Sequence, residues 1–389
     1  MLQIDHVYEF LYHELFIDFE FWHLYNGVPK IGNVTLSDIS IFTQKNNSSK
    51  KIFFYDQEPV LSDLSQPYLN LLDSVPNNDT KCFVVSERSQ TVDFLCNQHS
   101  LSPLYYFFHG FASLDWYRGF YSLNYNKKIN RQYRYDFISF NRILTNDRSY
   151  RLYFVSRLAE KNLLKNNLIS FGVVDTGQDW IPELSDKNTK LSQNAVDLIK
   201  NYAPKNKLVI DNEYIHGSAS ADIPRNIDTY IHPGFSGPPD VDALWHVVTE
   251  TVFYYDKLHL TEKIFKPIAS KQPFMLLAAP GNLEYLRSYG FKTFDGIIDE
   301  SYDTITDNDQ RVDAVVEQLQ WYCNLSPEEK QSVIERLAPI VDYNFHHFYG
   351  EFKHIITREL LDNTKTLFKE IGYDDSNIAY DNIYKVLTN

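Results

Sequence analysis

The sequence predicts an α/β fold built from two Rossmann-like halves, and three observations predict it. Short, continuous apolar runs recur along the chain, as is typical of parallel strands that are buried on both faces. Segments with helical periodicity lie between these runs. A polar and basic stretch at residues 124–134 interrupts the alternation, in a chain of 389 residues that is long enough for two domains of ordinary size.

The first half of the chain shows the alternation of strands and helices. Apolar runs at 50–60, 81–87 and 103–111 predict three buried strands. The segments at 63–75 and 89–99 lie between them and have the spacing of amphipathic helices. Strands that alternate with helices favour a parallel sheet covered by helices.

The second half repeats the pattern after residues 124–134, whose composition suits an interdomain linker. The predicted strands lie at 135–141, 207–211, 229–234, 243–251 and 273–280, and the predicted helices at 149–164, 261–270 and 282–290. Two such halves with a linker predict a cleft between them, where open α/β sheets bind ligands.

The end of the chain is helical in period over residues 326–368. Ser326 is a suitable N-cap, and Glu328 and Glu329 suit the first turn of a helix. The predicted domains are therefore an N-terminal acceptor-side domain, a C-terminal ligand-binding domain and a helical segment that packs back across both, at 1–128, 129–345 and 346–389.

Charge and cysteine content narrow the function classes. With 37 Lys and Arg against 51 Asp and Glu, the net charge of −14 disfavours nonspecific binding to a phosphate backbone. Three scattered cysteines do not make a disulfide framework or a zinc site, which indicates a reducing compartment such as the cytoplasm of a bacterium or of an infected host cell. No run of ~18 uncharged apolar residues occurs, so no membrane span is predicted. Residues 1–27 lack the pattern of a signal peptide.

Two carboxylates lie at the end of the predicted strand at 50–60. Asp56 and Glu58, in "YDQEPV", lie where a parallel strand presents side chains to a cleft, and one of them is suited to act as a general base. A polar turn held by an Asx-type hydrogen bond is the alternative. Asp56 and His109, which is in the third apolar run, are further candidates for the acceptor side of the cleft.

Basic residues gather where the second half begins. The strand at 135–141 ends at Asn141, and Arg142, Arg148 and Arg151 lie at or just before the start of the next helix. The helix dipole disfavours cations there by about 0.3–1 kcal/mol each, unless an anion is bound by the arginines and the helix amides together. A diphosphate fits this description, and solvated arginines at a surface helix are the alternative.

The third segment with candidate site residues is "ETVFYYDKLHLTEKIFKP", residues 250–267. Glu250 ends a predicted strand, and Thr261 is suited to cap the helix that begins with Glu262 and Lys263. The carboxylates suit ribose or sugar hydroxyls, while Lys263 suits a diphosphate. A simple helix cap with solvated charges is the alternative.

The three segments, in this order, resemble the α-1,3-fucosyltransferases of glycosyltransferase family 10, inverting GT-B enzymes that use a GDP-sugar. The similarity lies in short islands within 50–60 and 135–290, namely "FFYDQEP", "RLYFVSRL" and "HVVTETVFYYDKLHLTEK". It implies the GT-B architecture, in which two Rossmann-like domains face a central cleft, here with additional C-terminal helices.

The resemblance also implies roles for single residues. Glu58 takes the place of the proposed base, and Arg151 that of the arginine on the donor diphosphate. Glu250 matches the first acid of the family signature, while Glu262 and Lys263 match its "EK". The family's "ENS" reads "ETV" in this chain.

Residues and resemblance together predict a metal-independent, inverting glycosyltransferase. It would move a sugar from a nucleotide-sugar co-substrate, for example GDP- or UDP-linked, to a hydroxyl of a glycan or small molecule. No other cofactor and no metal are expected, because no D-x-D motif stands at the end of a predicted strand; "DVD" at 240–242 precedes one.

Three alternatives stay open. A phage-type enzyme that glycosylates hydroxymethylated pyrimidines in DNA would use the basic segments 45–51 and 124–135, and the Asn-, Lys-, Ile- and Tyr-rich composition suits a bacterial or phage source. A non-catalytic module would bind a nucleotide or a glycan without transfer. An epimerase-like enzyme would need acid–base histidines, for which His232, His246 and His259 are the candidates.

Overall fold

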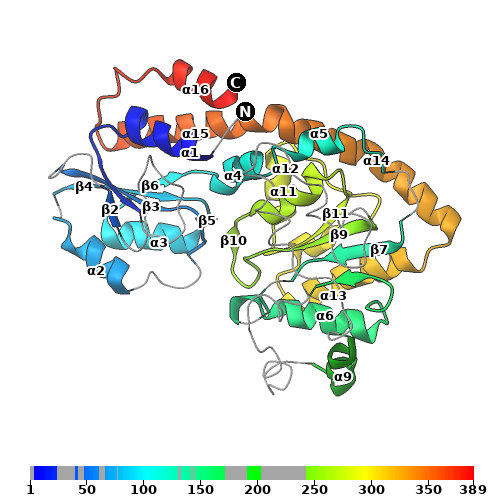
Figure 1. Cartoon of the computed structure of the whole chain (residues 1–389). Coiled ribbons are helices and arrows are strands. Elements are labelled where there is room, and N and C mark those ends of the chain that lie inside the picture. The colour runs from blue at the N-terminus through cyan, green and yellow to red at the C-terminus, as the bar shows by residue number, and fades with distance from the viewer. Residues whose placement is uncertain are drawn as a thin grey trace. The chain divides into compact units, whose positions relative to one another are not determined.

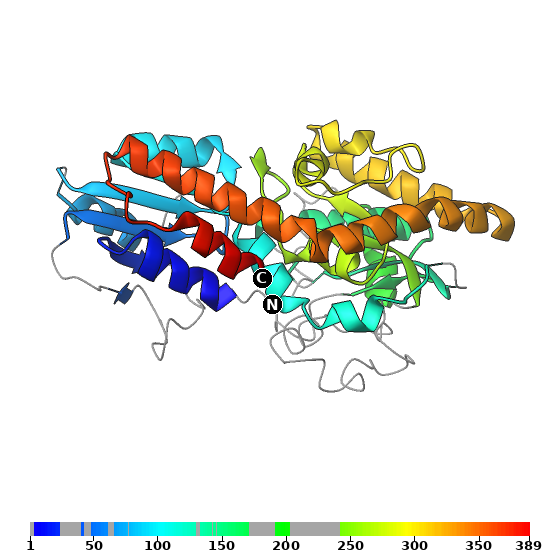
Figure 2. The same cartoon turned by 90° about the horizontal axis from the view of Figure 1, so that it is seen from above.

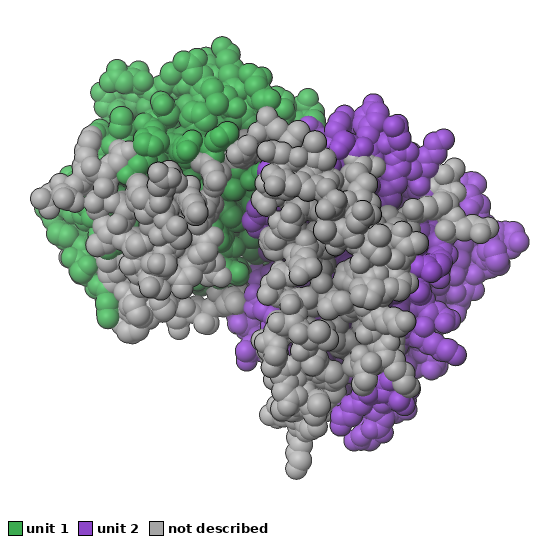
Figure 3. All heavy atoms as spheres, in the orientation of Figure 1, with its two compact units in different colours: residues 1–115, 257–259, 350–389 green, residues 116–256, 260–349 purple. Residues whose placement is uncertain are grey.

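The chain forms two compact units, coloured separately in Figure 3. The first comprises residues 1–115, 257–259 and 350–389, and the second residues 116–256 and 260–349. The N-terminal stretch of the first unit ends at Asp115, before the domain boundary that the sequence predicted at residue 128. The computed structural model describes residues 4–23, 40–42, 48–60, 66–76, 78–129, 133–141, 143–144, 146–170, 191–202 and 242–389.

The first unit contains a mainly parallel sheet, whose described strands follow the order β2-β1-β3-β4-β6. Strands β1, β3, β4 and β6 run parallel, and β2 pairs antiparallel with β1 at one edge. The strand bounds are Glu20–His23 (β1), Ser40–Phe42 (β2), Lys50–Tyr55 (β3), Thr80–Val85 (β4) and Ser102–Tyr105 (β6). The predicted strands at 50–60 and 81–87 are confirmed.

Helices cover both faces of this sheet, as Figures 1 and 2 show. Phe53 and Phe83 pack against the side of α2 (Gln66–Ser74) and α3 (Gln90–His99). Neighbouring side chains point to the opposite face because successive strand residues alternate. There Phe54 contacts Tyr8 of α1 (Ile4–Phe10), and Phe368 of α15 (Glu351–Glu370) packs on Phe16 and Phe19, which follow η1 (Leu11–Leu15).

The expected strand at 103–111 is only partly correct. Strand β6 ends at Tyr105, and α4 begins at Phe108 and continues to Trp116. Residues 108–115 of this helix are all buried, so the helix has no exposed polar face that would give its sequence a helical period. A continuous apolar run does not distinguish a buried strand from a buried helix.

A short antiparallel pair completes the first unit. Strand β5 (Arg88–Ser89) pairs with β10 (Lys257–Leu258). The Nζ atom of Lys257 lies 2.7 Å from the Glu87 carboxylate, and both side chains are buried. The other oxygen of Glu87 accepts a hydrogen bond from the amide of Val60 at 2.7 Å. These bonds satisfy the buried charges of the pair, as burial requires.

The second unit contains a parallel sheet with the described order β11-β9-β7-β8. Its strands are β7 (Tyr135–Ser139), β8 (Leu168–Ile169), β9 (Ala243–Thr249) and β11 (Phe274–Leu277). Every residue of β9 is buried, as expected for a central parallel strand. The predicted strands at 135–141, 243–251 and 273–280 are confirmed, while those at 207–211 and 229–234 lie outside the described residues.

Helices pack on both faces of the second sheet. On one face Trp245 of β9 contacts Tyr322 of α13 (Asn308–Cys323), and α6 (Tyr150–Glu160) lies beside α13 and α9 (Gln193–Tyr202) in Figure 1. On the other face lies α11 (Glu262–Ala269), whose Phe265 ring stacks on Phe348 of α14 (Pro327–Tyr349). The remaining elements are α5 (Phe120–Asn124), η2 (Asn146–Arg148), α12 (Asn282–Ser288) and η6 (Ser301–Thr304).

The predicted helical end of the chain consists of α14 (Pro327–Tyr349), α15 and α16 (Tyr380–Thr388). The predicted cap is confirmed as a reciprocal pair. The amide of Glu329 donates to Ser326 Oγ, and the amide of Ser326 donates to the Glu329 carboxylate at 2.8 Å. Among the described residues, no helix combines the length and the apolar character needed to cross a membrane.

Candidate functional site

The second sheet has a topological switch point between β7 and β9. From β7 the chain passes through α6 to β8 on one side, whereas β9 lies on the other side of β7. Ligands of open α/β sheets bind outside the carboxyl ends of the strands at such a point. Asn141 follows β7 and Glu250 follows β9, so two of the predicted site residues lie there.

Asn141 joins the ends of three strands. It is fully buried, and its Oδ1 accepts a hydrogen bond from Thr249 Oγ1 at the end of β9 (3.2 Å). The backbone amide of Asn141 donates to Ser170 Oγ just after β8 at 2.8 Å, and its side-chain Nδ2 donates to Ser139 Oγ at 3.3 Å. These bonds fix the strand ends that border the switch point.

Glu250 links the end of β9 to the start of α11. Its side chain is 0% exposed. One carboxylate oxygen accepts from the amide of Thr261 at 3.1 Å, and the other accepts from Thr261 Oγ1 at 2.6 Å and from the amide of Thr251 at 3.1 Å. The sequence suggested that Glu250 binds ligand hydroxyls, and in the structure its carboxylate is bonded to Thr251 and Thr261, which both contact Lys263.

Helix α11 starts at this edge of the sheet. The predicted cap is confirmed, because the Thr261 side chain accepts from the amide of Lys263. The Lys263 ammonium lies 3.2 Å from Thr251 Oγ1, 3.1 Å from Thr261 Oγ1 and 3.0 Å from the Glu262 carboxylate. Its side chain is 31% exposed, so it combines fixed geometry with access from outside.

Lys263 carries its charge at neutral pH. Burial lowers the pKa of its ammonium, but the nearby Glu262 and Glu250 carboxylates outweigh burial and hold that pKa above the ordinary value. A cation at a helix N-terminus is unfavourable to the helix dipole. The two carboxylates compensate for this in the structure, and an incoming anion would meet both the ammonium and the helix amides.

The described arginines near the switch point differ in exposure. Arg151 is buried and donates to the carbonyl oxygens of Ile143 (2.9 Å) and Thr249 (2.8 Å) and to that of Glu250, so it holds the end of β9. Its Nε is buried and has no hydrogen-bond partner among the described residues. Arg148 ends η2 and is half-buried. Arg142 lies outside the described residues.

Tyr254, in the segment between β9 and α11, was not predicted as a site residue from the sequence. The Tyr150 and Phe253 rings stack at 4.0 Å and are both buried, and Tyr254 stands edge-on to both. Tyr254 is 39% exposed, and its hydroxyl lies 2.9 Å from Ser149 Oγ. Three consecutive aromatic residues, 253–255, directly after a buried strand were the available signal.

In the first unit, the carboxyl end of β3 carries Asp56 and Glu58. Asp56 is 0% exposed and accepts a hydrogen bond from the Tyr8 hydroxyl at 2.6 Å. Burial raises the pKa of Asp56 to about 7, and the Tyr8 hydrogen bond offsets only part of this. Glu58 lies in the loop after β3 and is half-buried, so it is the more accessible of the two carboxylates.

His109 and His259 lie close together near the loop after β3. His109 Nε2 donates to the carbonyl oxygen of Gln57 at 2.8 Å, and His259 Nδ1 donates to that of Ser86 at 3.2 Å. Their ring centres lie 5.3 Å apart. The third candidate histidine, His246, is buried in β9, with Nδ1 3.2 Å from the Gln272 side-chain oxygen, and His232 lies outside the described residues.

The described part of the chain contains no group of three or more His, Cys, Asp or Glu side chains arranged to hold a metal ion. Comparisons with protein-family models, with curated proteins and with solved structures gave no match. The function of the site must therefore be inferred from its own chemistry.

Proposed function

We propose that the protein is an inverting glycosyltransferase of the GT-B type that transfers a sugar from a nucleoside-diphosphate donor to a hydroxyl. One observation carries the proposal. The switch point between β7 and β9 is bordered by a helix N-terminus and by the fixed, charged and accessible ammonium of Lys263. A leaving diphosphate needs preorganised positive charge, which this arrangement supplies without a metal. The resemblance to family 10 fucosyltransferases, in the same segments, supports the proposal.

The proposed donor residues fall into two groups by their exposure. Lys263, Glu262 and Arg148 are accessible and would contact the donor. Glu250, Arg151, Asn141 and Thr261 are buried and would act as positioning residues, because they hold the strand ends and the start of α11. The base would be Glu58 of the first unit, which takes the proton of the acceptor hydroxyl in a single displacement that inverts the sugar.

A glycan or a small molecule is the preferred acceptor. The DNA alternative needs exposed and unpaired basic residues; Lys128 is exposed, but three other described cations of the basic segments are paired or hydrogen-bonded to protein groups. Lys127 donates to the carbonyl oxygen of Ser270 at 2.7 Å, Arg134 pairs with Asp242 at 2.6 Å, and Lys51 pairs with Glu20 at 2.8 Å. Together with the net charge of −14, this disfavours a DNA backbone as ligand.

A thermal-shift screen of GDP-, UDP-, dTDP- and CMP-sugars tests donor binding. A ligand at 100 times its Kd raises the unfolding free energy by about 2.7 kcal/mol, enough to identify base and sugar together.

Lys263→Ala removes a charged hydrogen bond to phosphate, so we expect the Kd of the bound nucleotide to rise roughly 10- to 100-fold. The control is Lys200→Ala, which changes an exposed lysine on α9. An unchanged Kd in Lys263→Ala would exclude the site.

The same screen separates an enzyme from a binding module. Glu58→Gln is expected to leave the donor-induced shift unchanged while abolishing sugar transfer to acceptors. Release of nucleoside diphosphate only in the presence of acceptor would distinguish transfer from epimerisation. Donor binding by the unaltered protein without transfer to any glycan, small-molecule or DNA acceptor would favour the module.

A further inference from the structure

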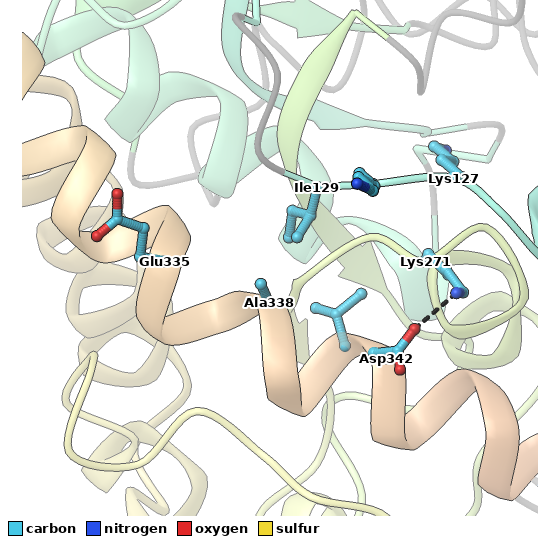
Figure 4. A pocket seen from close by; sticks show the side chains of 8 residues that line it. Lys127, Ile129, Lys271, Glu335, Ala338 and Asp342 are labelled. Atoms are coloured by element: carbon cyan, nitrogen blue, oxygen red, sulfur yellow. Dashed lines mark hydrogen bonds and ion pairs between the residues drawn. The ribbon is translucent and has the colours of Figure 1, made fainter.

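The second unit contains a pocket at the far end of α11 from the proposed donor site. Lys263 stands at the N-terminus of this helix, whereas Lys271, which lines the pocket, follows its C-terminus, about 12 Å along the axis. The pocket has a volume of about 420 Å³, within the range of small-molecule sites. Figure 4 shows it between the segment 127–129 and α14.

The walls of the pocket are fixed by hydrogen bonds at the end of α11. Asn124 Nδ2 and Lys127 Nζ donate to the carbonyl oxygens of Ala269 (3.2 Å) and Ser270 (2.7 Å), which the helix leaves unpaired at its C-terminus. Lys271 donates to the carbonyl oxygen of Tyr125 at 2.9 Å and pairs with Asp342 of α14 at 2.6 Å. These contacts tie the segment after α5 to both helices, so the pocket is already formed without a ligand.

Positive and negative charges in the pocket nearly balance. Three lysines line it, but Lys271 is paired with Asp342, and the ammonium of Lys127 is bound to a carbonyl oxygen. Lys128 and Glu335 are exposed at the rim and carry opposite charges. Ammonium donors and carboxylate acceptors therefore alternate around the pocket, which suits a ligand whose hydroxyl groups can both donate and accept hydrogen bonds.

The remaining surface of the pocket is apolar. Ile129 faces Ala338 of α14 in Figure 4, and Val341 lies one turn further along this helix. A sugar ring has apolar C–H faces and a rim of hydroxyls, which match the aliphatic wall of Ile129, Ala338 and Val341 and the charged groups at the edge.

We propose that this pocket binds a sugar ring of a neutral glycan, with Lys128 and Glu335 as hydrogen-bonding partners of its hydroxyls. The choice of a glycan rests on the proposed function, because a transferase with a glycan acceptor gains affinity from a second contact on a longer acceptor. The binding itself requires no donor and no transfer.

Saturation-transfer NMR with methyl glycosides of glucose, galactose, mannose and N-acetylglucosamine tests the pocket. We expect transfer to at least one glycoside and about tenfold weaker binding in the double variant Lys128→Ala/Glu335→Ala. The matched control is Lys200→Ala/Glu328→Ala, which removes an exposed lysine and an exposed glutamate away from the pocket. All four positions are exposed, so both variants are expected to fold, which circular dichroism checks.

Three results would overturn the inference: no transfer to any glycoside, equal binding in the double variant, or displacement of the glycoside by inorganic phosphate. The failure of the proposed function looks different. In that case nucleotide-sugars give no thermal shift, while the glycoside signal and its loss in the double variant remain. Conversely, a failed pocket leaves the nucleotide-sugar shift and its dependence on Lys263 intact.

Discussion

Two carboxylic acids two residues apart in "YDQEPV" occupy different environments, and this difference sets their chemistry. Asp56 is buried under the Tyr8 hydroxyl, and its pKa rises to about 7 because burial disfavours the charged form. Glu58 is half-buried. A base must reach the proton that it removes, so Glu58 is the better candidate of the two.

The raised pKa of Asp56 makes stability depend on pH. Its folded-state pKa of about 7 exceeds the ordinary value of 3.8, so the native state holds the proton more tightly than the unfolded chain. The resulting stabilisation is complete below about pH 4 and is lost as the pH rises towards 7, with a slope of up to about 1.4 kcal/mol per pH unit.

Asp56→Asn removes the titrating group, and Asn retains an oxygen that can accept from Tyr8. We expect the unfolding free energy of the unaltered protein to fall by a few kcal/mol between pH 5 and 8 relative to that of the variant. Urea denaturation at each pH measures this difference. Parallel pH profiles for the two proteins would show that Asp56 is ionised throughout this range.

At the scale of elements, the connection from β9 to α11 depends on one hydroxyl. Thr261 Oγ1 donates to Glu250 at 2.6 Å and accepts from the amide of Lys263. Thr261→Val keeps the shape but loses both bonds, leaving a fully buried carboxylate short of a donor. We expect a loss of about 1–3 kcal/mol in unfolding free energy and weaker nucleotide binding, because Lys263 also contacts this hydroxyl at 3.1 Å.

Thr261→Ser is the control for this prediction. It keeps the hydroxyl and removes only a methyl group, so its unfolding free energy and nucleotide Kd should stay near those of the unaltered protein. If Ser and Val variants lose the same stability, the hydroxyl bonds do not support the site. Chemical denaturation and titration with the nucleotide found in the screen measure both quantities.

The sequence predicted much of this element but not its partners. The cap at Thr261 follows from local pattern, since Thr, Glu and Lys stand in order before an apolar helical period. The bond from Thr261 to Glu250 depends on how residues 251–260 turn back, which no local pattern specifies. For the same reason, Arg151 was expected to face an anion, whereas in the structure it donates to strand-end carbonyls. The pairing of backbone carbonyls with a distant arginine is a tertiary property.

At the scale of the whole molecule, the sequence predicted an α/β protein with parallel sheets, and this is confirmed. The assembly of the first unit from three separate stretches of chain was less accessible. Residues 350–389 belong with residues 1–115, although a long helical period continues across Gly350 from α14 into α15. Periodicity shows that a helix has an apolar face, but not which sheet that face covers.

Phe368 of α15 tests whether the two units unfold separately. It is fully buried, and its ring lies 5.2 Å from that of Phe16 and 6.1 Å from that of Phe19. Phe368→Ala leaves a cavity in the first unit and is expected to cost about 3–5 kcal/mol there. In hydrogen-exchange mass spectrometry, β1 and β3 should exchange faster while β7 and β9 keep their protection.

Phe94→Ala, at a 66% exposed position on α3, is the control and should change neither region. Faster exchange in both sheets of the Phe368 variant would mean that the units unfold together, because exchange of a cooperative structure follows its global free energy.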